Sequence, residues 1–395
     1  MSVNVTVSQR ERAAAIVSAA SSTKDGLAPV DVERFWADEA VCGRNVWAPP
    51  QMPLGIRMGN ERVFAELGVP EDWRRLVHDH AWRASLCKAY NDKAERLVGR
   101  RLLDETVGDP SRAWPGTKGL HDIFEAKNVW HHESYWLMQA ANTPDELQAL
   151  LDRVEGRLER LRDFVLPPGW DAEKERLRAL GVPPPRYRGQ RGPVTFAMSV
   201  YGVENLIFLL VDEPALAGRF RDLVLKAMLA LAEVLDKEAG DTAETAPHGF
   251  YFCDDNCCLL DAELYEFFGY PVLKGVFERF SPSPGDMRGQ HSDSAMGHLL
   301  PLLGRLGMTH VNFGPTLTVA EIRERLPGAL IDGQLAPFTF SRDEQVGVVA
   351  ELLRDFEMSR ERKGVRFSTA GSVNDGSRLA TMRLLMHAIQ EHCRY

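Results

Sequence analysis

A histidine and an aspartate two residues apart are the side chains of this sequence best suited to chemistry. His291 and Asp293 lie in the stretch "GQHSDSAMGHLLPLLGRLG", just before a leucine-rich segment. An imidazole and a carboxylate from one loop can bind a divalent metal ion together, or they can act as a general acid and base. Two structural roles stay open beside these: Asp293 could cap the following helix, and His291 could be a hydrogen-bonded core histidine.

Two further acids follow an apolar segment in the stretch "GFYFCDDNCC". Asp254 or Asp255 could complete the ligand shell of a metal ion held by His291 and Asp293, and Asp255 is the third ligand that we predict. Without a metal ion, the same acids could stabilise positive charge that develops on a substrate. Asp255 or its neighbour Asn256 could instead cap a turn. Cys257 is a less favoured ligand, because it could begin an apolar helix or turn.

Polar side chains also stand at the ends of other predicted strands. Tyr201 is a candidate proton donor, although it could serve only in packing. The candidates for substrate binding are Asn312 and Gln334 together with His132 and Glu133, which could also form a solvated loop.

Alternating strands and helices must position these residues. From residue 192 onward, the pattern predicts strands at 193–200, 249–253, 287–291, 309–313, 329–334 and 365–369, each followed by a helix. Such alternation is typical of a parallel sheet covered by helices. With one or two earlier strands within 121–138, the count approaches eight, which predicts a (β/α)8 barrel. In that fold the carboxyl ends of all strands open into one cleft, where the candidate residues would meet.

The first part of the chain reads mainly as helix. Apolar residues recur at helical spacing in 30–39, 60–65 and 73–103. We therefore expect residues 1–115 to form a helical extension packed on a barrel formed by 116–395. Thr143 and Glu146 have the spacing of a capping box at the start of a further helix. No G-x-G-x-x-G stretch follows an early strand, which disfavours a dinucleotide-binding fold.

Composition excludes several classes of protein. The 395 residues are 44% hydrophobic and 26% charged, with a net charge of −9. This composition is typical of a globular protein. No block of basic residues indicates nucleic-acid binding. No run of about 18 apolar residues predicts a membrane span. Six cysteines are too few for a disulfide framework at this length, so we expect a cytoplasmic protein.

Several motifs resemble the uroporphyrinogen decarboxylase superfamily. They are "GPVTFAMSVYGVENLIFLLVDEP", "QHSDSAMGHLLPLLGRLGMTHVNF", "LIDGQLAP" and "FSTAGSVNDGSRLATMRLLMHAI", and the resemblance covers about residues 190–395. It implies a (β/α)8 barrel with a deep cleft at the carboxyl ends of the strands. The superfamily includes cofactor-free porphyrinogen decarboxylases and zinc methyltransferases that act on methyl-cobalamin or methyl-folate with thiol acceptors. Tyr201 carries over by position.

The sequence departs from both groups of that superfamily. The arginine-rich segment of the decarboxylases has only a poor counterpart in "GIRMGNERVFAEL", and "TAGSV" replaces their late histidine. The zinc site of the methyltransferases uses His-x-Cys and a later cysteine. Here His291-Ser292-Asp293 stands in the first position and Ala370–Gly371 in the second. Carboxylate in place of thiolate hardens the site, which makes zinc activation of a thiol less favoured and leaves zinc or another divalent ion as the cofactor that we expect.

Three functions follow from these residues. The first is a metal-assisted enzyme that transfers an alkyl (methyl) group or cleaves a C–C bond of a small polar substrate. The second is a cofactor-free decarboxylase that uses a carboxylate with His291 or Tyr201. The third is a barrel that binds a small molecule without catalysis. The resemblance also suggests a homodimer, and it leaves a corrinoid partner protein open.

Overall fold

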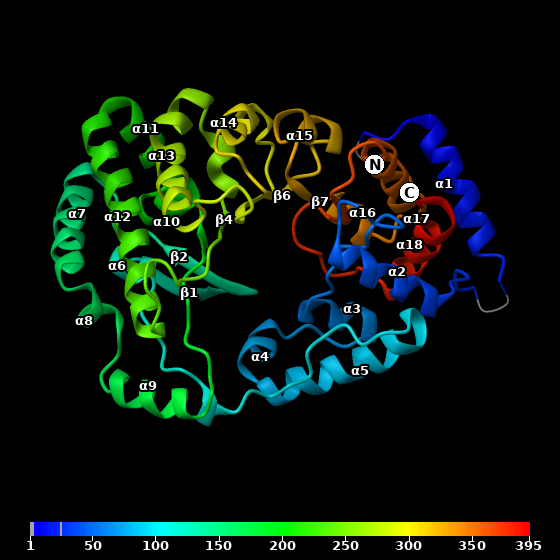
Figure 1. Ribbon diagram of the computed structural model, residues 1–395, viewed down its shortest axis with the longest axis horizontal. Helices are drawn as coiled ribbons and strands as arrows, with labels where there is room; N and C mark the ends of the chain where they lie inside the picture. The colour runs from blue at the N-terminus through cyan, green and yellow to red at the C-terminus, as the bar shows by residue number, and fades with distance from the viewer. Residues whose placement is uncertain (1–3, 24–25) are drawn as a thin grey trace. The chain divides into compact units, whose positions relative to one another are not determined.

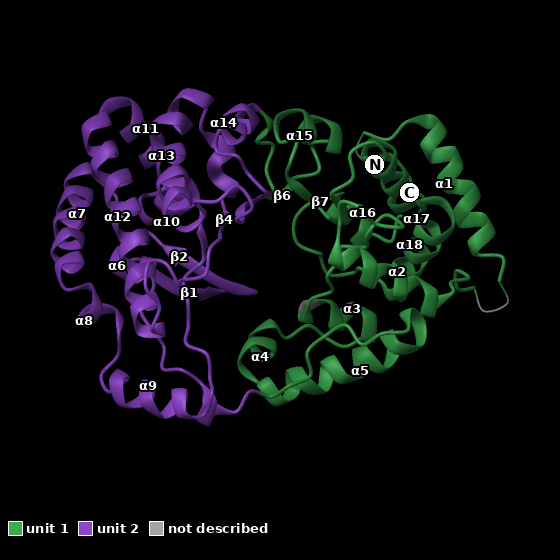
Figure 2. Cartoon of the chain, in the orientation of Figure 1, with its two compact units in different colours: residues 1–107, 293–297, 310–395 green, residues 108–292, 298–309 purple. Residues whose placement is uncertain are grey.

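The computed structural model describes residues 4–23 and 26–395, which form two compact units. Unit 1 comprises residues 1–107, 293–297 and 310–395, and unit 2 comprises residues 108–292 and 298–309. Figure 1 labels the helices and strands, and Figure 2 colours the units. Each unit contains part of the predicted alternation of strands and helices.

Unit 2 contains five strands and a larger number of helices. In chain order its elements are η2 (Pro110–Arg112), α6 (Leu120–Ile123), β1 (Lys127–His131), β2 (Ser134–Met138), α7 (Pro144–Glu159), α8 (Leu161–Val165), α9 (Trp170–Ala179), β3 (Gly189–Arg191), α10 (Pro193–Tyr201), α11 (Val203–Asp212), α12 (Pro214–Ala239), β4 (Phe250–Cys253), η3 (Asp255–Leu259), α13 (Ala262–Phe280), β5 (Arg288–Ser292) and α14 (Leu300–Arg305). A short 3-10 turn, η4 (Gly297–Leu299), precedes α14.

Strands β3, β4 and β5 run parallel and form one ladder of unit 2. Their two faces differ in burial. Phe252 and Gln290, which lie side by side in the ladder, are fully buried on one face. On the other face Cys253 is exposed and its ladder partner His291 is only half-buried. Because side chains alternate along a strand, the less buried face carries the candidate histidine.

The segment 193–200, predicted as a strand, is a helix, and this prediction was wrong. Pro193 lies at the first position of α10, where a missing N–H costs nothing. Within this helix only Thr195 and Ser199, four residues apart, are not fully buried. A short run that is apolar on almost every side has the same pattern in a buried strand and in a buried helix. The strand of this region is the much shorter β3.

The region 121–138 supplies a hairpin of unit 2. Strands β1 and β2 pair antiparallel, with His131 opposite Ser134, so His132 and Glu133 form the turn. His132 adopts a φ of 51°, the left-handed conformation that two-residue hairpin turns require. The two strands that the sequence left uncertain are therefore present, but as an antiparallel pair. Thr143 caps α7 as predicted, through the Glu146 N–H, while the Glu146 carboxylate accepts from Asn142 N instead of the cap.

Unit 1 combines helices from the first 107 residues with the last strands and helices. Its elements are α1 (Val7–Ala20), α2 (Val32–Arg44), η1 (Asn60–Arg62), α3 (Val63–Leu67), α4 (Trp73–His78), α5 (His80–Val98), β6 (His310–Phe313), α15 (Val319–Arg325), β7 (Leu330–Leu335), α16 (Pro337–Ser341), α17 (Gln345–Ser359), β8 (Val365–Thr369) and α18 (Leu379–His392). Helix α1 packs on α17, and α5 packs on α18.

Strands β6, β7 and β8 run parallel, and the chain just after α2 extends this ladder. Leu54 forms a parallel bridge with Phe367 of β8, and the N–H groups of Gly55 and Phe367 donate to Phe367 O and Pro53 O. The sequence did not predict a strand there. The ladders confirm an α/β fold with parallel strands, whereas closure into an eight-stranded barrel stays a prediction.

Buried charges hold the carboxyl end of β7. Arg354 of α17 donates to Asp355 Oδ1 (2.7 Å) and to Gln334 O (2.8 Å). Gln334 N donates to Asp355 Oδ2, and Ala336 N donates to Glu351 Oε2. Paired charges that are fully hydrogen-bonded are tolerated in a core, and here they fix the backbone where β7 ends.

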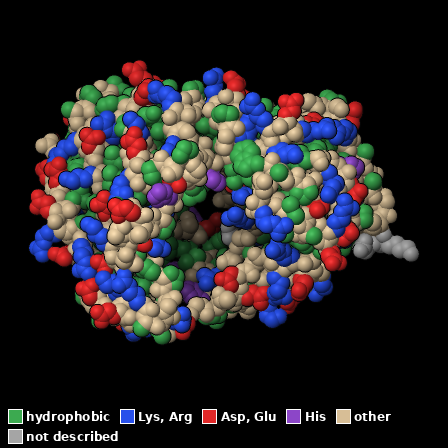
Figure 3. All heavy atoms as spheres, viewed as in Figure 1, with side chains coloured by type: hydrophobic (Ala, Val, Ile, Leu, Met, Phe, Trp, Pro, Cys, Tyr) green, Lys and Arg blue, Asp and Glu red, His purple; other side chains and the backbone are tan. Residues whose placement is uncertain are grey.

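On the face in Figure 3, acidic and basic side chains are interspersed. Within 4–23 and 26–395, no single helix is long and apolar enough to cross a membrane; α10 and α11 meet that test only as a pair bent by 104°.

Candidate functional site

A histidine–carboxylate pair lies at the carboxyl ends of two neighbouring strands of unit 2. His291 is near the end of β5, and Asp255 begins η3, two residues after β4. Their Nε2 and Oδ1 atoms are 3.7 Å apart. The His291 side chain is 18% exposed and that of Asp255 is 45% exposed, so the pair can be reached by a small molecule.

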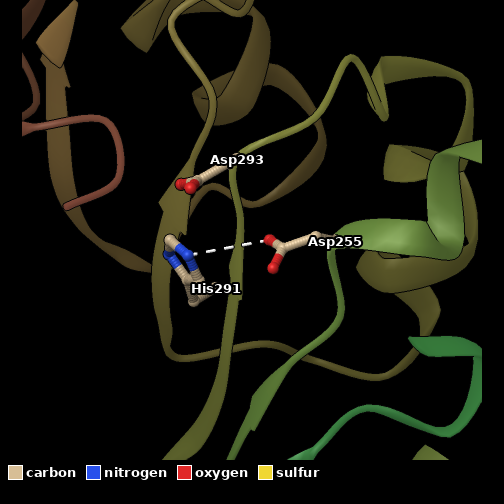
Figure 4. Close-up of side chains that lie close together, drawn as sticks. All are labelled: Asp255, His291 and Asp293. Carbon is tan, nitrogen blue, oxygen red and sulfur yellow. Dashed lines mark ion pairs between the residues drawn. The ribbon is translucent and has the colours of Figure 1, made fainter. Parts of the chain in front are cut away.

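Asp293 brings a third ligand atom to this pair. One ligand atom each from Asp255, His291 and Asp293 lies within 4.8 Å of the others. Figure 4 shows the three side chains pointing toward one another. Ligand bonds of about 2.0–2.2 Å place neighbouring ligand atoms about 3–4 Å apart around zinc, so small side-chain movements would let all three bind one ion. The predicted trio of ligands is therefore brought together.

A glycine makes room for the Asp293 carboxylate. A Cβ atom built on Gly371 would lie 2.3 Å from Asp293 Oδ1, and the φ of Gly371 is 117°. Any side chain at this position would overlap the carboxylate. The resemblance places a late cysteine ligand near Ala370–Gly371, so Asp293 fills the space that such a side chain would need.

The structure separates the two neighbouring acids Asp254 and Asp255. Asp254 is fully buried, and its Oδ1 accepts from Thr195 N at 2.8 Å. Asn256 N donates to the hydroxyl of the same threonine, and Asp254 N donates to His291 O. Burial raises the pKa of Asp254 to about 6, although the bond from Thr195 N lowers it. Asp254 thus positions the backbone around Asp255 and His291 and does not face solvent.

Two residues on the open face of the ladder, Arg191 and Tyr251, escaped the sequence analysis. Arg191 pairs with Cys253 across β3 and β4, and Cys253 pairs with His291 across β4 and β5. Two residues before Cys253, the Tyr251 ring covers its ladder partner Gly289. A Cβ atom added to Gly289 would lie 2.2 Å from this ring. The alternation of side chains along neighbouring strands could have placed these residues on the same face as His291. The sequence did not predict β3, so Arg191 was missed.

Tyr201, Gln334 and Asn312 are the other candidates that were predicted at strand ends. Tyr201 is the last residue of helix α10, so its predicted place at a strand end was wrong. Burial raises the pKa of its hydroxyl. The Gln334 amide donates to the carbonyls of Phe313, Gly314 and Leu317 at 2.9–3.1 Å. Asn312 donates to Asp332 O and Thr369 O. These amide groups already bind backbone, and their role toward a substrate stays a prediction.

His132 and Glu133 are exposed in the β1–β2 turn. Their predicted role in substrate binding also remains a prediction.

Comparison with protein-family models and with curated proteins finds no match. Among solved structures, a methyltransferase from Methanosarcina mazei shares the fold, with a TM-score of 0.53 and 14% sequence identity. The match covers 89% of this chain and 97% of that chain. At this identity the likeness establishes a common fold, and it agrees at that level with the resemblance drawn from the motifs.

Proposed function

We propose that this protein is a metal-dependent methyltransferase of the uroporphyrinogen decarboxylase superfamily, with a (β/α)8 barrel. The observation that carries the proposal is the convergence of Asp255, His291 and Asp293 at the ends of β4 and β5. A neighbour in fold that is a methyltransferase supports the reaction class. One nitrogen and two carboxylate oxygens suit zinc or another borderline divalent ion.

Three residues would bind the ion, and two others position the loop after β4. His291, Asp255 and Asp293 would hold the ion, which supplies Lewis-acid activation of the methyl acceptor when bound. Each carboxylate has two oxygens, so one can bind the ion while the other takes the proton released by the acceptor. Asp254 and Thr195 keep the loop after β4 in place. A methyl-cobalamin or methyl-folate donor, presented with or without a corrinoid protein, is the source we propose for the methyl group.

A second reaction has one specific observation in its favour. The cluster offers carboxylates where the related zinc enzymes have thiolates, and hard ligands favour binding of oxygen atoms of a substrate over activation of a thiol. Metal-assisted cleavage of a C–C bond next to a carbonyl or carboxylate is therefore the alternative. The two reactions share the same ion site and differ in the acceptor.

Measuring bound metal tests both reactions. We expect zinc or cobalt to bind the purified protein at one ion per chain, and His291→Ala to reduce the affinity strongly, because three ligands become two. His248→Ala is the matched control, since His248 Nδ1 and Asp286 Oδ2 form another histidine–carboxylate pair in unit 2 at 3.0 Å. Equal metal content in both variants would refute the site.

A further inference from the structure

Arg191 lies in the same row of the ladder as His291, one of the three candidate metal ligands. Arg191 pairs with Cys253, which pairs with His291, so all three side chains leave one face of the sheet. Two strand spacings, about 10 Å, separate the backbone of Arg191 from that of His291. The exposed guanidinium of Arg191 can therefore face a ligand that also reaches the ion site.

The charge of Arg191 is not balanced by a carboxylate. Its Nη1 donates to the hydroxyl of Ser199 at 3.1 Å, and that hydroxyl donates to Thr195 O at 2.7 Å. Within the described part of the chain, no acidic side chain lies within 4.0 Å of the Arg191 guanidinium. By contrast, Arg153 and Arg219 of the same unit pair with acids. Ser199 thus orients the guanidinium and leaves its other N–H groups for a ligand.

An aromatic ring lies next to the row formed by Arg191, Cys253 and His291. The Tyr251 ring packs against Gly289. A larger residue at position 289 would prevent this contact, because an added Cβ would lie 2.2 Å from the ring. The ring lies on the same face as Arg191 and His291, two residues before Cys253. It presents an apolar surface next to a polar row.

We propose that Arg191 binds the carboxylate of a small acidic substrate whose reacting group lies at the ion site. A guanidinium recognises a carboxylate through two parallel N–H···O bonds, which no lysine or amide reproduces. The row spacing suits a substrate in which two to four bonds separate the carboxylate from the reacting atom. This assignment rests on the proposed function, because it takes the ion site as the reacting end.

Binding of two thiols of equal chain length, one ending in a carboxylate and one in an alcohol, tests the assignment. We expect the zinc-loaded wild-type protein to bind 3-mercaptopropionate about ten-fold or more tightly than 3-mercapto-1-propanol, measured by calorimetry. Arg191→Met should remove this preference without changing the zinc content, and Arg191→Lys should restore only part of it. Arg153→Met, which removes an arginine paired with Glu125, should keep the preference. A preference that survives in Arg191→Met overturns the assignment.

An error in the proposed metal site can be distinguished from an error in the role of Arg191. If the wild-type protein binds no zinc, the proposed function is refuted, and Arg191 is then tested without metal. Propionate, but not propionamide, should slow the reaction of Arg191 with phenylglyoxal, followed by mass spectrometry of the modified peptide. Equal protection by the acid and the amide would overturn the assignment on its own.

Discussion

Asp254 and Asp255 are neighbours in sequence whose side chains meet opposite surroundings. The first is enclosed behind the sheet and accepts a hydrogen bond from Thr195 N, and the second is 45% exposed beside His291. Alternation past a strand end separates such neighbours. Their substitutions should therefore affect different properties of the protein.

We expect Asp254→Ala to lower the free energy of unfolding by about 2 kcal/mol, because it leaves Thr195 N without its acceptor and opens a small cavity. Asp254→Asn keeps the acceptor and should cost less than about 1 kcal/mol. Asp255→Ala should change stability by less than about 0.5 kcal/mol but weaken zinc binding about ten-fold or more. Denaturant unfolding and metal titration separate these effects. Weak metal binding in Asp254→Asn at full stability would contradict a purely positioning role.

Gly371 offers a test of the Asp293 carboxylate from outside the ligand set. Gly371→Ala should displace Asp293, because the new Cβ would come within 2.3 Å of Oδ1 and the backbone φ of 117° is unfavourable for alanine. We expect weaker binding of cobalt, seen as a change in its visible absorption. Gly328→Ala is the control, since its Cβ would meet nothing within 4 Å. Unchanged cobalt affinity in Gly371→Ala would show that Asp293 is not a ligand.

At the scale of elements, a buried carboxylate of α2 binds the segment that pairs with β8. Glu39 of α2 accepts from Gln51 Nε2 (2.9 Å) and from Leu54 N (3.2 Å). Leu54 in turn bridges to Phe367 of β8. Burial raises the pKa of Glu39 from 4.5 to about 7, although these hydrogen bonds lower it.

This raised pKa predicts that stability falls with pH. In the folded protein Glu39 keeps its proton up to about pH 7, while the unfolded chain releases it near pH 4.5. The folded state binds more protons between these values, so the free energy of unfolding decreases as pH rises through that window. Glu39→Gln removes this loss and should exceed wild type in stability by about 1–3 kcal/mol at pH 8 but not at pH 4.

Denaturant unfolding at the two pH values measures the difference. Glu33→Gln, an exposed position on the same helix, controls for the loss of one negative charge. The raised pKa would be contradicted if the difference in free energy of unfolding between Glu39→Gln and wild type were the same at pH 4 and pH 8.

At the scale of the whole molecule, unit 1 is assembled from segments far apart in the sequence. Helix α1 packs on α17, and Gln9 Nε2 donates to Glu357 Oε2 at 2.7 Å. Met52 N donates to Cys393 O at 2.8 Å. The first 107 residues thus supply backbone and side-chain contacts to the last strands and helices. The expected division at residue 115 stays a prediction, and these contacts make it testable.

We expect a protein that consists of residues 116–395 to lack cooperative thermal unfolding. Removal of the first 115 residues exposes the faces of α17 and α18 that α1 and α5 cover, and it takes away the bridge between Leu54 and Phe367 of β8. Circular dichroism and a thermal melt measure this, with the full chain as the reference. A sharp transition in the shorter protein would instead support a removable helical extension.

The sequence alone predicted five of the parallel strands and their helices well. Strands β4 to β8 are short runs bounded by turn residues, and each lies within a residue or two of its predicted range. A buried parallel strand has this local signature wherever its neighbours come from. The same local pattern predicted His291, Asp293 and Asp255 as one group, because strand ends gather side chains by simple alternation.

Only the tertiary structure determined the features that local sequence patterns do not encode. The run 193–200 is apolar on nearly every side, so only its packing within unit 2 made it helix α10. The segment around Leu54 has no strand pattern, and it pairs with β8 because Glu39 and Phe367, distant in sequence, supply its hydrogen bonds. Arg191 joined the row of His291 only once β3 took its place beside β4. Periodicity records which side of an element is buried, whereas the identity of the neighbour depends on contacts between residues far apart in the chain.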